Sequence, residues 1–496
     1  MPETPPSPLL TPAAPVDRSR RPDPGSPGAA RVAWLVLVVS FLLVAGIQAM
    51  TAMQADQAPA PAEPPAQPTN QTAGLAAEPP APIFEMVSKV TIATATNLQA
   101  VADEKELSDT VRLLAGFART EADKVRVAIL AAEIGRAEDP RAAVALDQLK
   151  KVDTADPSIG DDVWTLTAMW TGQPVTAAQE TLLVQRYGFF GELALARSRP
   201  EGASAPVIDQ LSGLLTLFSV VTLGGIVLLA LGVMLLVILV AMVGLGKFET
   251  RFVPPTRGGS VYLEAAAVFV AGFLVLKGVL LAVAHLPLDA ASQTIAALGL
   301  QWLLLAAVLW PLVRGEKFHE WCLATGWHRG AGLIKEVACG VAGWIAAVPL
   351  FIAAGLISAG LVAAWELIKG NPDGPRPLPD AAIFDLLSQG NTALIVAVFA
   401  LGTIWAPLAE ESIFRGCLYR HLRGRLGIVL SSVLVASVFG FMHGYGVLFV
   451  PPVIALGFAF SIMREWRGSI IAPVTAHLLH NATLITFMIL MTKLMG

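Results

Sequence analysis

The chain has 496 residues, of which 55% are hydrophobic and only 15% are charged, whereas about a quarter of the residues in soluble proteins are charged. The net charge of −4 is too small to indicate nucleic acid or a strongly charged partner. The three cysteines, Cys322, Cys339 and Cys417, lie far apart and support neither a disulfide framework nor a zinc ribbon.

The first 83 residues hold one apolar segment between two proline-rich segments. Residues 1–31 are rich in Pro, Ala, Ser and Arg, so we expect a disordered cytoplasmic tail. Residues 32–50 form an apolar block long enough to cross a bilayer, and the long lead-in favours an uncleaved signal-anchor helix. The Pro/Ala-rich residues 51–83 predict an extended, semi-rigid linker.

Residues 84–205 alternate apolar and charged residues at helical spacing, which predicts a small soluble all-α domain. No motif in this segment indicates chemistry. We interpret it as a packing module or as a contact site for a protein partner.

The remainder, residues 214–495, is expected to be a membrane domain. Together with the anchor it predicts an all-α, polytopic transmembrane bundle of about eight core helices plus one N-terminal helix. The expected core spans are 214–245, 261–285, 294–313, 338–369, 391–413, 427–443, 447–463 and 469–493.

Positive charge in the connecting loops predicts the orientation. Basic residues gather in four alternate loops, at 247–257, 314–335, 420–425 and 464–467, whereas the loops at 286–293 and 370–390 hold few. Because basic loops stay on the cytoplasmic side, we expect a cytoplasmic N-terminus and an extracytoplasmic segment 51–213. In a bacterium this describes a multi-pass protein of the cytoplasmic membrane.

Ionisable residues in membrane segments are candidates for function because charge is costly in hydrocarbon. In "EESIFR", Glu411 and Arg415 are four residues apart, an order that favours an ion pair on a helix. Glu410 lies about 100° around the same helix and has no local partner. It must find a proton, a water molecule or another side chain.

Two further clusters follow in the next segments. Phe439 and His443 are four residues apart, as are His477 and Asn481, with His480 beside them. A carboxylate and an imidazole can deprotonate a water molecule, and a second imidazole with a carboxamide could donate to an oxyanion. This set suits peptide-bond hydrolysis without a covalent intermediate.

Each cluster also has a plain structural interpretation. Glu410, Glu411 and Arg415 could form a solvated helix end. His443 could be a hydrogen-bonded packing residue, and His477 with Asn481 could hold helices together.

The order Glu-Glu-x-x-x-Arg, Phe-x-x-x-His and His-x-x-x-Asn on successive membrane segments resembles the CPBP family. This family contains the CAAX proteases and bacteriocin-processing enzymes, intramembrane endopeptidases related to the type II CAAX prenyl endoprotease. The resemblance covers roughly residues 340–493 and leaves out the anchor, the linker and the soluble domain. It implies that Glu410 activates water together with His443, and that His477 and Asn481 stabilise the oxyanion. Glu411, Arg415 and Phe439 would support the site.

A metal is not settled by the residues. Glu410, His443 and His477 could ligate zinc, but the chain has no His-Glu-x-x-His motif. The resemblance implies that a glutamate mechanism can work without a metal, so we expect no cofactor and leave zinc open.

Two other functions compete with an endopeptidase that acts on a membrane-associated or leader-type peptide. A proton-coupled transporter or channel could use the same residues as a relay, although the chain shows no inverted repeat. A catalytically inactive scaffold is the third. We expect a peptide or protein substrate at the membrane, contact with the lipid bilayer and no nucleic acid.

Span counting raises one geometric difficulty. It places Glu410 near the inner end of its helix and His443 near the outer end of the next. The two meet only if a span is tilted, re-entrant or shortened, and "GFMHGYG" at 440–446 with Pro451-Pro452 offers places for such a break.

Overall fold

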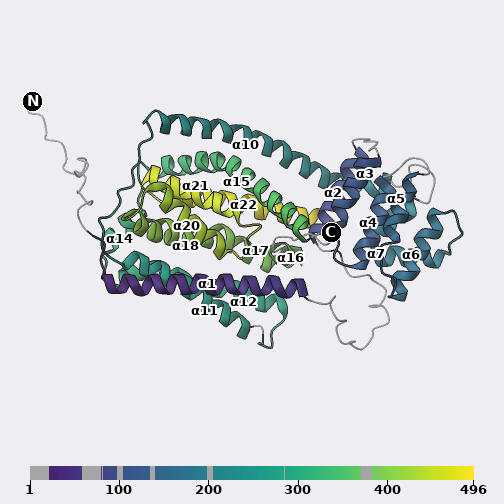
Figure 1. Cartoon of the computed structure of the whole chain (residues 1–496), viewed down its shortest axis with the longest axis horizontal. Helices are drawn as coiled ribbons and strands as arrows, with labels where there is room; N and C mark the ends of the chain where they lie inside the picture. Colours follow the sequence, from purple (N-terminus) through teal and green to yellow (C-terminus); the bar gives the residue numbers. More distant parts are fainter. Residues whose placement is uncertain are drawn as a thin grey trace, which may run out of the picture.

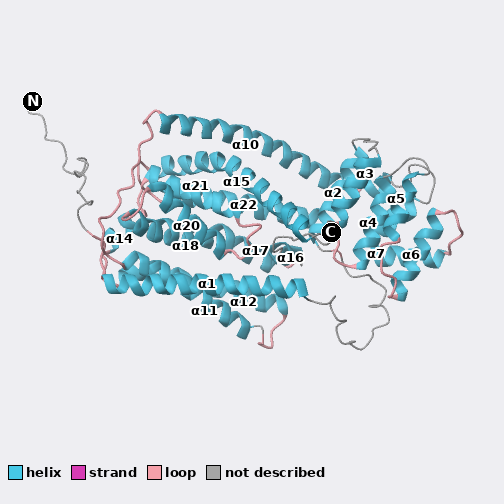
Figure 2. Ribbon diagram, in the orientation of Figure 1, coloured by secondary structure: helices cyan, strands magenta, loops and turns pink. Residues whose placement is uncertain are grey.

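The computed structural model describes residues 22–57, 80, 82–97, 104–134, 140–197, 205–283, 285–369, 382–388 and 390–495. These residues form helices joined by loops and contain no β-strand (Figure 2). Seven of the described helical stretches are long and apolar enough to cross a bilayer. They are Pro27–Val44, Ser212–Gly244, Val261–Leu280, Ala290–Val313, Leu333–Ile368, Thr392–Arg423 and Ile471–Leu494. The chain is therefore a multi-pass membrane protein with an all-helical bundle, as predicted.

The N-terminal elements are α1 (Pro27–Gln57), α2 (Pro82–Asn97), α3 (Glu104–Ala115), α4 (Glu121–Ile134), α5 (Pro140–Leu149), α6 (Pro157–Trp170), α7 (Ala177–Tyr187), α8 (Phe189–Arg197) and α9 (Ala205–Asp209). The first half of the membrane part holds α10 (Ser212–Gly244), α11 (Val261–Val283), α12 (Ala290–Gln301), η2 (Trp302–Leu309), α13 (Trp310–Val313), α14 (Phe318–Thr325) and α15 (Leu333–Lys369). The second half holds α16 (Ala382–Ser388), α17 (Thr392–Ala400), η3 (Leu401–Trp405), α18 (Ala406–Glu410), η4 (Glu411–Leu418), α19 (Tyr419–Arg423), α20 (Ile428–Met442), α21 (Pro451–Arg467) and α22 (Ile471–Met495).

Figure 1 shows a bundle of long helices with a cluster of shorter helices, α2 to α7, at one end. We call the end of the bundle that lies away from this cluster the opposite end. Within the cluster, α4 is buried on nearly every side. Local sequence fixes the helix starts, because Asp156 caps α6 before Pro157, and Thr176 with Gln179 forms a capping box on α7.

The helical cluster rests on the membrane bundle through a continuous apolar core. Leu214 at the start of α10, Phe384 in α16 and Met491 near the end of α22 share one hydrophobic cluster with the buried residues of α2 to α8. Burial of this surface stabilises the junction at about 25 cal/mol per Å² of apolar area. The cluster of short helices is thus seated on the end of the helix that carries His477 and Asn481.

The N-terminal segment is part of the bundle from residue 22 onwards. The backbone N–H groups of Ser260 and Val261 donate to the Pro24 carbonyl, at 2.9 and 3.1 Å, and Arg420 binds the Asp23 carboxylate at 2.7 Å. The expected disordered tail at 1–31 therefore ends earlier, because these contacts order residues 22–26 and α1 begins at Pro27. Residues 1–21 and most of the expected linker, 58–79, lie outside the described residues.

Two expected spans, 427–443 and 447–463, form a short hairpin. Helix α20 has 15 residues and α21 has 17, whereas α15 has 37 and α22 has 25. At 1.5 Å per residue, α20 is about 22 Å long and falls short of the roughly 30 Å hydrocarbon core. In Figure 1 the hairpin lies toward the opposite end, and α22 continues beyond it to the helical cluster.

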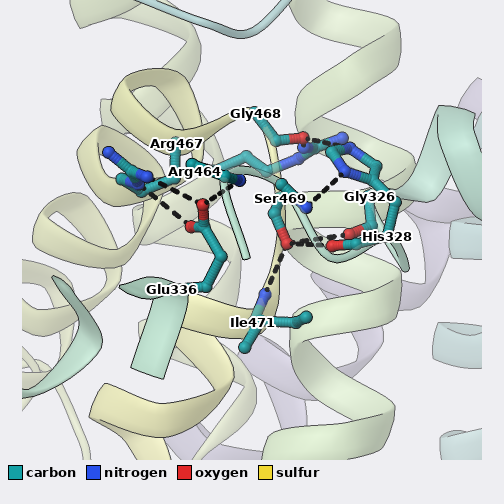
Figure 3. Close-up of polar contacts among 10 residues, drawn as sticks. Gly326, His328, Glu336, Arg464, Arg467, Gly468, Ser469 and Ile471 are labelled. Carbon is teal, nitrogen blue, oxygen red and sulfur yellow. Dashed lines mark hydrogen bonds and ion pairs between the residues drawn. The ribbon is translucent and has the colours of Figure 1, made fainter. Parts of the chain in front are cut away.

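At the opposite end, a polar network joins α15, α21 and the start of α22 (Figure 3). Arg467 donates twice to the Glu336 carboxylate, at 2.7 and 3.0 Å. Arg464 donates to the carbonyl groups of Ala324, at 3.0 Å, and Gly468. Ser469 donates to the His328 carbonyl at 2.8 Å. These bonds fix how the three long helices enter the bundle.

Candidate active site

The candidate residues Glu410, Glu411 and Arg415 lie on one long helical run, α17 to α19. Two stretches of this run, η3 and η4, are π-helical, and such wide turns gather at functional sites. Glu410 ends the short α-helical piece between them, and Glu411 opens η4. No residue pattern within Glu411–Leu418 predicts the wide turn η4. The spacing of Gly402 and Pro407 was the one available signal for η3.

The wide turn η3 has a clear local cause. The Ala406 N–H donates to the Leu401 carbonyl, five residues back, and Pro407 has no N–H to give. The Gly402 carbonyl therefore loses both of its helical donors. Asn481 replaces them with its Nδ2, which donates to the Gly402 oxygen at 2.8 Å. This bond ties α22 to the helix that carries Glu410.

Glu411 sits at the centre of a buried charge cluster. Its Oε1 accepts a hydrogen bond from Arg415 Nη1 at 2.9 Å and lies 2.9 Å from His477 Nδ1. Both Glu411 and Arg415 are fully buried. The second guanidinium nitrogen of Arg415 donates to the Gly457 carbonyl at 3.0 Å. The ion pair expected from sequence spacing is present, and it also holds His477.

Glu410 is the least satisfied acid of the site. Its Oε2 is buried and has no hydrogen-bond partner, while its side chain is 15% exposed. The nearest imidazole nitrogen is His477 Nε2, at 3.9 Å, which is too long for a hydrogen bond. His477 thus lies between two carboxylates, bound to Glu411 through Nδ1 and facing Glu410 with Nε2.

Phe439 joins the other imidazole to this cluster. Its buried ring lies 4.5 Å from the Arg415 guanidinium, 4.7 Å from the His443 ring and 6.0 Å from the His477 ring. The guanidinium over the ring face is a favourable cation–π arrangement. Phe439 therefore separates the two histidines while contacting both.

His443 lies just beyond the end of α20, on an exposed part of the short hairpin. Its Nδ1 lies 2.8 Å from the Phe439 carbonyl oxygen, so Nδ1 must carry a proton to donate there. In the neutral ring, Nε2 is then the free acceptor. The Tyr445 ring stacks on the His443 ring at 5.8 Å, and the left-handed Gly444, at φ 78°, permits the turn between them.

The structure brings together a different pair from the one expected. His477, rather than His443, is the imidazole next to Glu410, and no hydrogen bond or ion pair joins the described side chains of Glu410 and His443. His480 packs against Phe351 at 5.0 Å, so it is a neighbour of the site. Sequence reasoning missed Phe460, whose ring stacks on His477 at 5.4 Å; its apolar surroundings gave no signal.

Zinc was left open, with Glu410, His443 and His477 as ligands. A zinc site needs three or four such donors around one point. Over the described ranges, no group of three His, Cys, Asp or Glu side chains is placed to hold a metal ion.

Residues 392–483 match the family model described as Type II CAAX prenyl endopeptidase Rce1-like. This range begins at α17 and ends within α22, and it contains every candidate residue from Glu410 to Asn481. Over this range the chain is similar to the Rce1-like family. The expected core at 340–493 encloses this range, and the N-terminal 391 residues lie outside the match.

One curated relative matches a short part of the chain. It is "Uncharacterized protein YpbD" of Bacillus subtilis (strain 168), 32% identical over 80 residues, which is 16% of this chain. The match spans 40% of the length of that relative. No solved structure matches the chain.

Proposed function

We propose that this chain is an intramembrane endopeptidase that cleaves a membrane-associated or leader-type peptide with a water molecule activated by Glu410. The observation that carries the proposal is the unpartnered, buried Glu410 Oε2, which faces His477 Nε2 inside the segment that matches a protease family. A buried polar atom without a partner is rare in a folded protein unless it has a role.

Glu410 serves as the general base. A water molecule within hydrogen-bond reach of both Glu410 Oε2 and His477 Nε2 fits a separation of 3.9 Å, because each contact then needs only about 2.8 Å. Glu410 removes a proton from this water molecule while the water oxygen attacks the scissile carbonyl carbon. The same proton then goes to the leaving amine as the C–N bond breaks.

His477 and Asn481 serve the oxyanion. The Nδ1 of His477 is held 2.9 Å from Glu411 Oε1, and a second proton on Nε2 would make the ring a donor at both nitrogens. Its Nε2–H is then a donor for the developing oxyanion. Asn481 uses one amide hydrogen on Gly402, which leaves the second for the same purpose.

His443 assists from the hairpin. Its Nδ1 is occupied by the Phe439 carbonyl at 2.8 Å, so its Nε2 is an acceptor for a proton. His443 is exposed, which suits contact with an incoming peptide. We assign it to water activation together with Glu410, with the contact formed when the substrate is bound.

The test compares the purified, liposome-reconstituted protein with Glu410→Gln on a set of lipid-anchored and leader-bearing peptides. We expect new peptide termini, read by mass spectrometry, from the wild type and from His480→Gln, a matched control whose ring packs against Phe351. Glu410→Gln should lower their yield about 100- to 10,000-fold. Equal cleavage by Glu410→Gln would refute the role of this residue. Proton flux across the vesicles that depends on Glu410, without any cleavage, would instead favour a transporter.

A further inference from the structure

Helix α10 stands apart from the rest of the bundle. Leu214 and Gly232 are its only residues described as buried, and in Figure 1 it arches along the edge of the bundle beside α15. The two helices touch at Gly232, where an added Cβ would lie 2.7 Å from the Pro349 ring. Glycine is required at this crossing because it lets the backbones meet.

On the opposite-end side of this crossing, a cavity of about 600 Å³ separates α10 from the bundle. Its walls come from α10, α15, α21 and the start of α20, and include Leu239, Ala342, Ala346, Ile428 and Met463. The lining segment of α10, residues 235–243, is about 13 Å long. A volume of this size is typical of ligand pockets rather than of packing defects.

The wall chemistry excludes a peptide as the occupant. Every lining side chain is apolar or the indole of Trp466. A peptide backbone in this groove would leave its N–H and C=O groups without partners, at a cost of several kcal/mol for each group in an apolar medium. A hydrocarbon chain has no such groups, so it fits the groove at no polar cost.

Positive charge surrounds the opposite-end mouth of the groove. Phe248 and Trp466 line this end. The exposed Lys247 precedes Phe248, and the backbone N–H of the exposed Arg251 donates to the Glu465 carbonyl at 3.0 Å, next to Trp466. Both cations are free of ion pairs with described residues.

A third cation, Lys335, extends this charge. It is exposed and lies seven and eleven residues before Ala342 and Ala346, on the same face of α15. The acid Glu249 offsets one of the three positive charges. The neighbouring Arg467 is bound to Glu336 at 2.7 Å. The mouth therefore keeps a surplus of positive charge.

We propose that this groove is a binding site for an acidic phospholipid, with an acyl chain between α10, α15 and α21 and the phosphate at Lys247, Arg251 and Lys335. The acyl chain fills the groove on one side of the Gly232 crossing and contacts both α10 and the rest of the bundle. The cations select an anionic headgroup over a zwitterionic one, since each basic residue near an anionic lipid contributes about 1 kcal/mol.

The experiment measures lipid retained by the full-length protein. Delipidated wild type is incubated with phosphatidylglycerol or phosphatidylcholine, and bound lipid is counted by native mass spectrometry. We expect phosphatidylglycerol to be retained in preference to phosphatidylcholine. Ala346→Trp, which fills the groove, should abolish retention, whereas Ala353→Trp, an exposed site on the same helix outside the groove, should leave it unchanged.

The headgroup contacts have their own variants. Lys247→Gln, Arg251→Gln and Lys335→Gln should each lower the preference for phosphatidylglycerol about fivefold, and Lys317→Gln, an exposed control away from the groove, should not. Equal retention of the two lipids, or retention that survives Ala346→Trp, would overturn the proposal. Displacement of phosphatidylglycerol by a farnesylated peptide at equal concentration would overturn it too, in favour of a substrate-tail site.

A second measurement protects the test from variants that fold poorly. Phosphatidylglycerol with brominated acyl chains quenches a tryptophan that it touches. In the wild type, brominated lipid should quench part of the tryptophan fluorescence, and the share of this quenching that comes from Trp466 should be absent in Trp466→Phe. The same quenching in wild type and Trp466→Phe would show that no acyl chain reaches the groove and would contradict the proposal.

Discussion

Two buried carboxylate clusters in the same bundle differ in how fully their hydrogen bonds are used. At the opposite end, Glu336 accepts from Arg467 through both oxygens, and its Oε1 also accepts from the Ala331 N–H at 2.9 Å. In the candidate active site, one oxygen of Glu410 and one oxygen of Glu411 have no partner. The difference separates a cluster that holds helices from one with capacity left for water and substrate.

Glu410→Gln should have the largest effect on cleavage, and it directly tests the cluster that has oxygens without partners. Loss of the general base should lower cleavage about 100- to 10,000-fold. The thermal denaturation midpoint in detergent should stay close to that of the wild type, because Glu410 Oε2 holds nothing in place. A large fall in that midpoint would place Glu410 with the structural carboxylates and break the comparison.

Glu411→Gln should affect both stability and activity. The change replaces the carboxylate shared by Arg415 and His477 with a neutral amide, so the fully buried guanidinium loses its charge partner. Loss of one partner of a buried pair costs about 3–5 kcal/mol. We expect a lower denaturation midpoint and no cleavage. A variant of wild-type stability would show that Arg415 finds another partner.

Glu336→Gln tests the opposite-end cluster, in which both carboxylate oxygens have partners. Arg467 keeps one neutral acceptor, so the expected loss of stability is smaller, about 1.5–3 kcal/mol, the worth of a hydrogen bond to a charged group. Cleavage per folded molecule, with the folded fraction determined by gel filtration, should match the wild type. Lost cleavage in the folded fraction would mean that the opposite-end network acts on the active site.

Asp162 is a third buried carboxylate, in the helical cluster, and its substitution should have the smallest effect on stability. Its Oδ2 accepts from Arg186 at 2.7 Å and Tyr187 at 2.9 Å. Burial, the largest influence, raises its pKa above the ordinary value. The folded state thus binds this proton more tightly than the unfolded state, so the contribution of Asp162 to stability is lost as pH rises through the raised pKa.

Asp162→Asn should remove that dependence. The denaturation midpoint of the wild type, relative to Asp162→Asn, should be higher near pH 4 than near pH 7. An opposite slope would show that Arg186 and Tyr187 outweigh burial.

Sequence alone predicted the seven helical stretches that are long enough to cross a bilayer and the Glu411–Arg415 pair, because both depend on local spacing. Twenty apolar residues span a bilayer whatever surrounds them, and residues four apart on an α-helix lie on the same face. The choice of imidazole beside Glu410 could not be predicted in this way. It depends on how α22 packs on the run from α17 to α19, and the wide turns η3 and η4 alter the angles at which Glu410 and Glu411 project.

The docking of residues 22–26 escaped prediction for a related reason. Their composition is that of a disordered segment, and order comes from Arg420 and Ser260, which lie more than two hundred residues away in the chain. A shortened span was one of the three arrangements expected to let His443 lie at the same depth as Glu410. The glycines and prolines at 440–452 marked the place, but only the packed helices show that α20 ends at Met442.

The short hairpin has a consequence for the surrounding lipid. One face of α20 is turned to the bilayer, since Val429 and Leu430 are more than half exposed, yet this helix is about 8 Å shorter than the hydrocarbon core. Such hydrophobic mismatch thins the adjacent membrane. Water and headgroups then approach His443 from the side of the bundle, so the thickness of the host membrane becomes a determinant of how easily the site is reached.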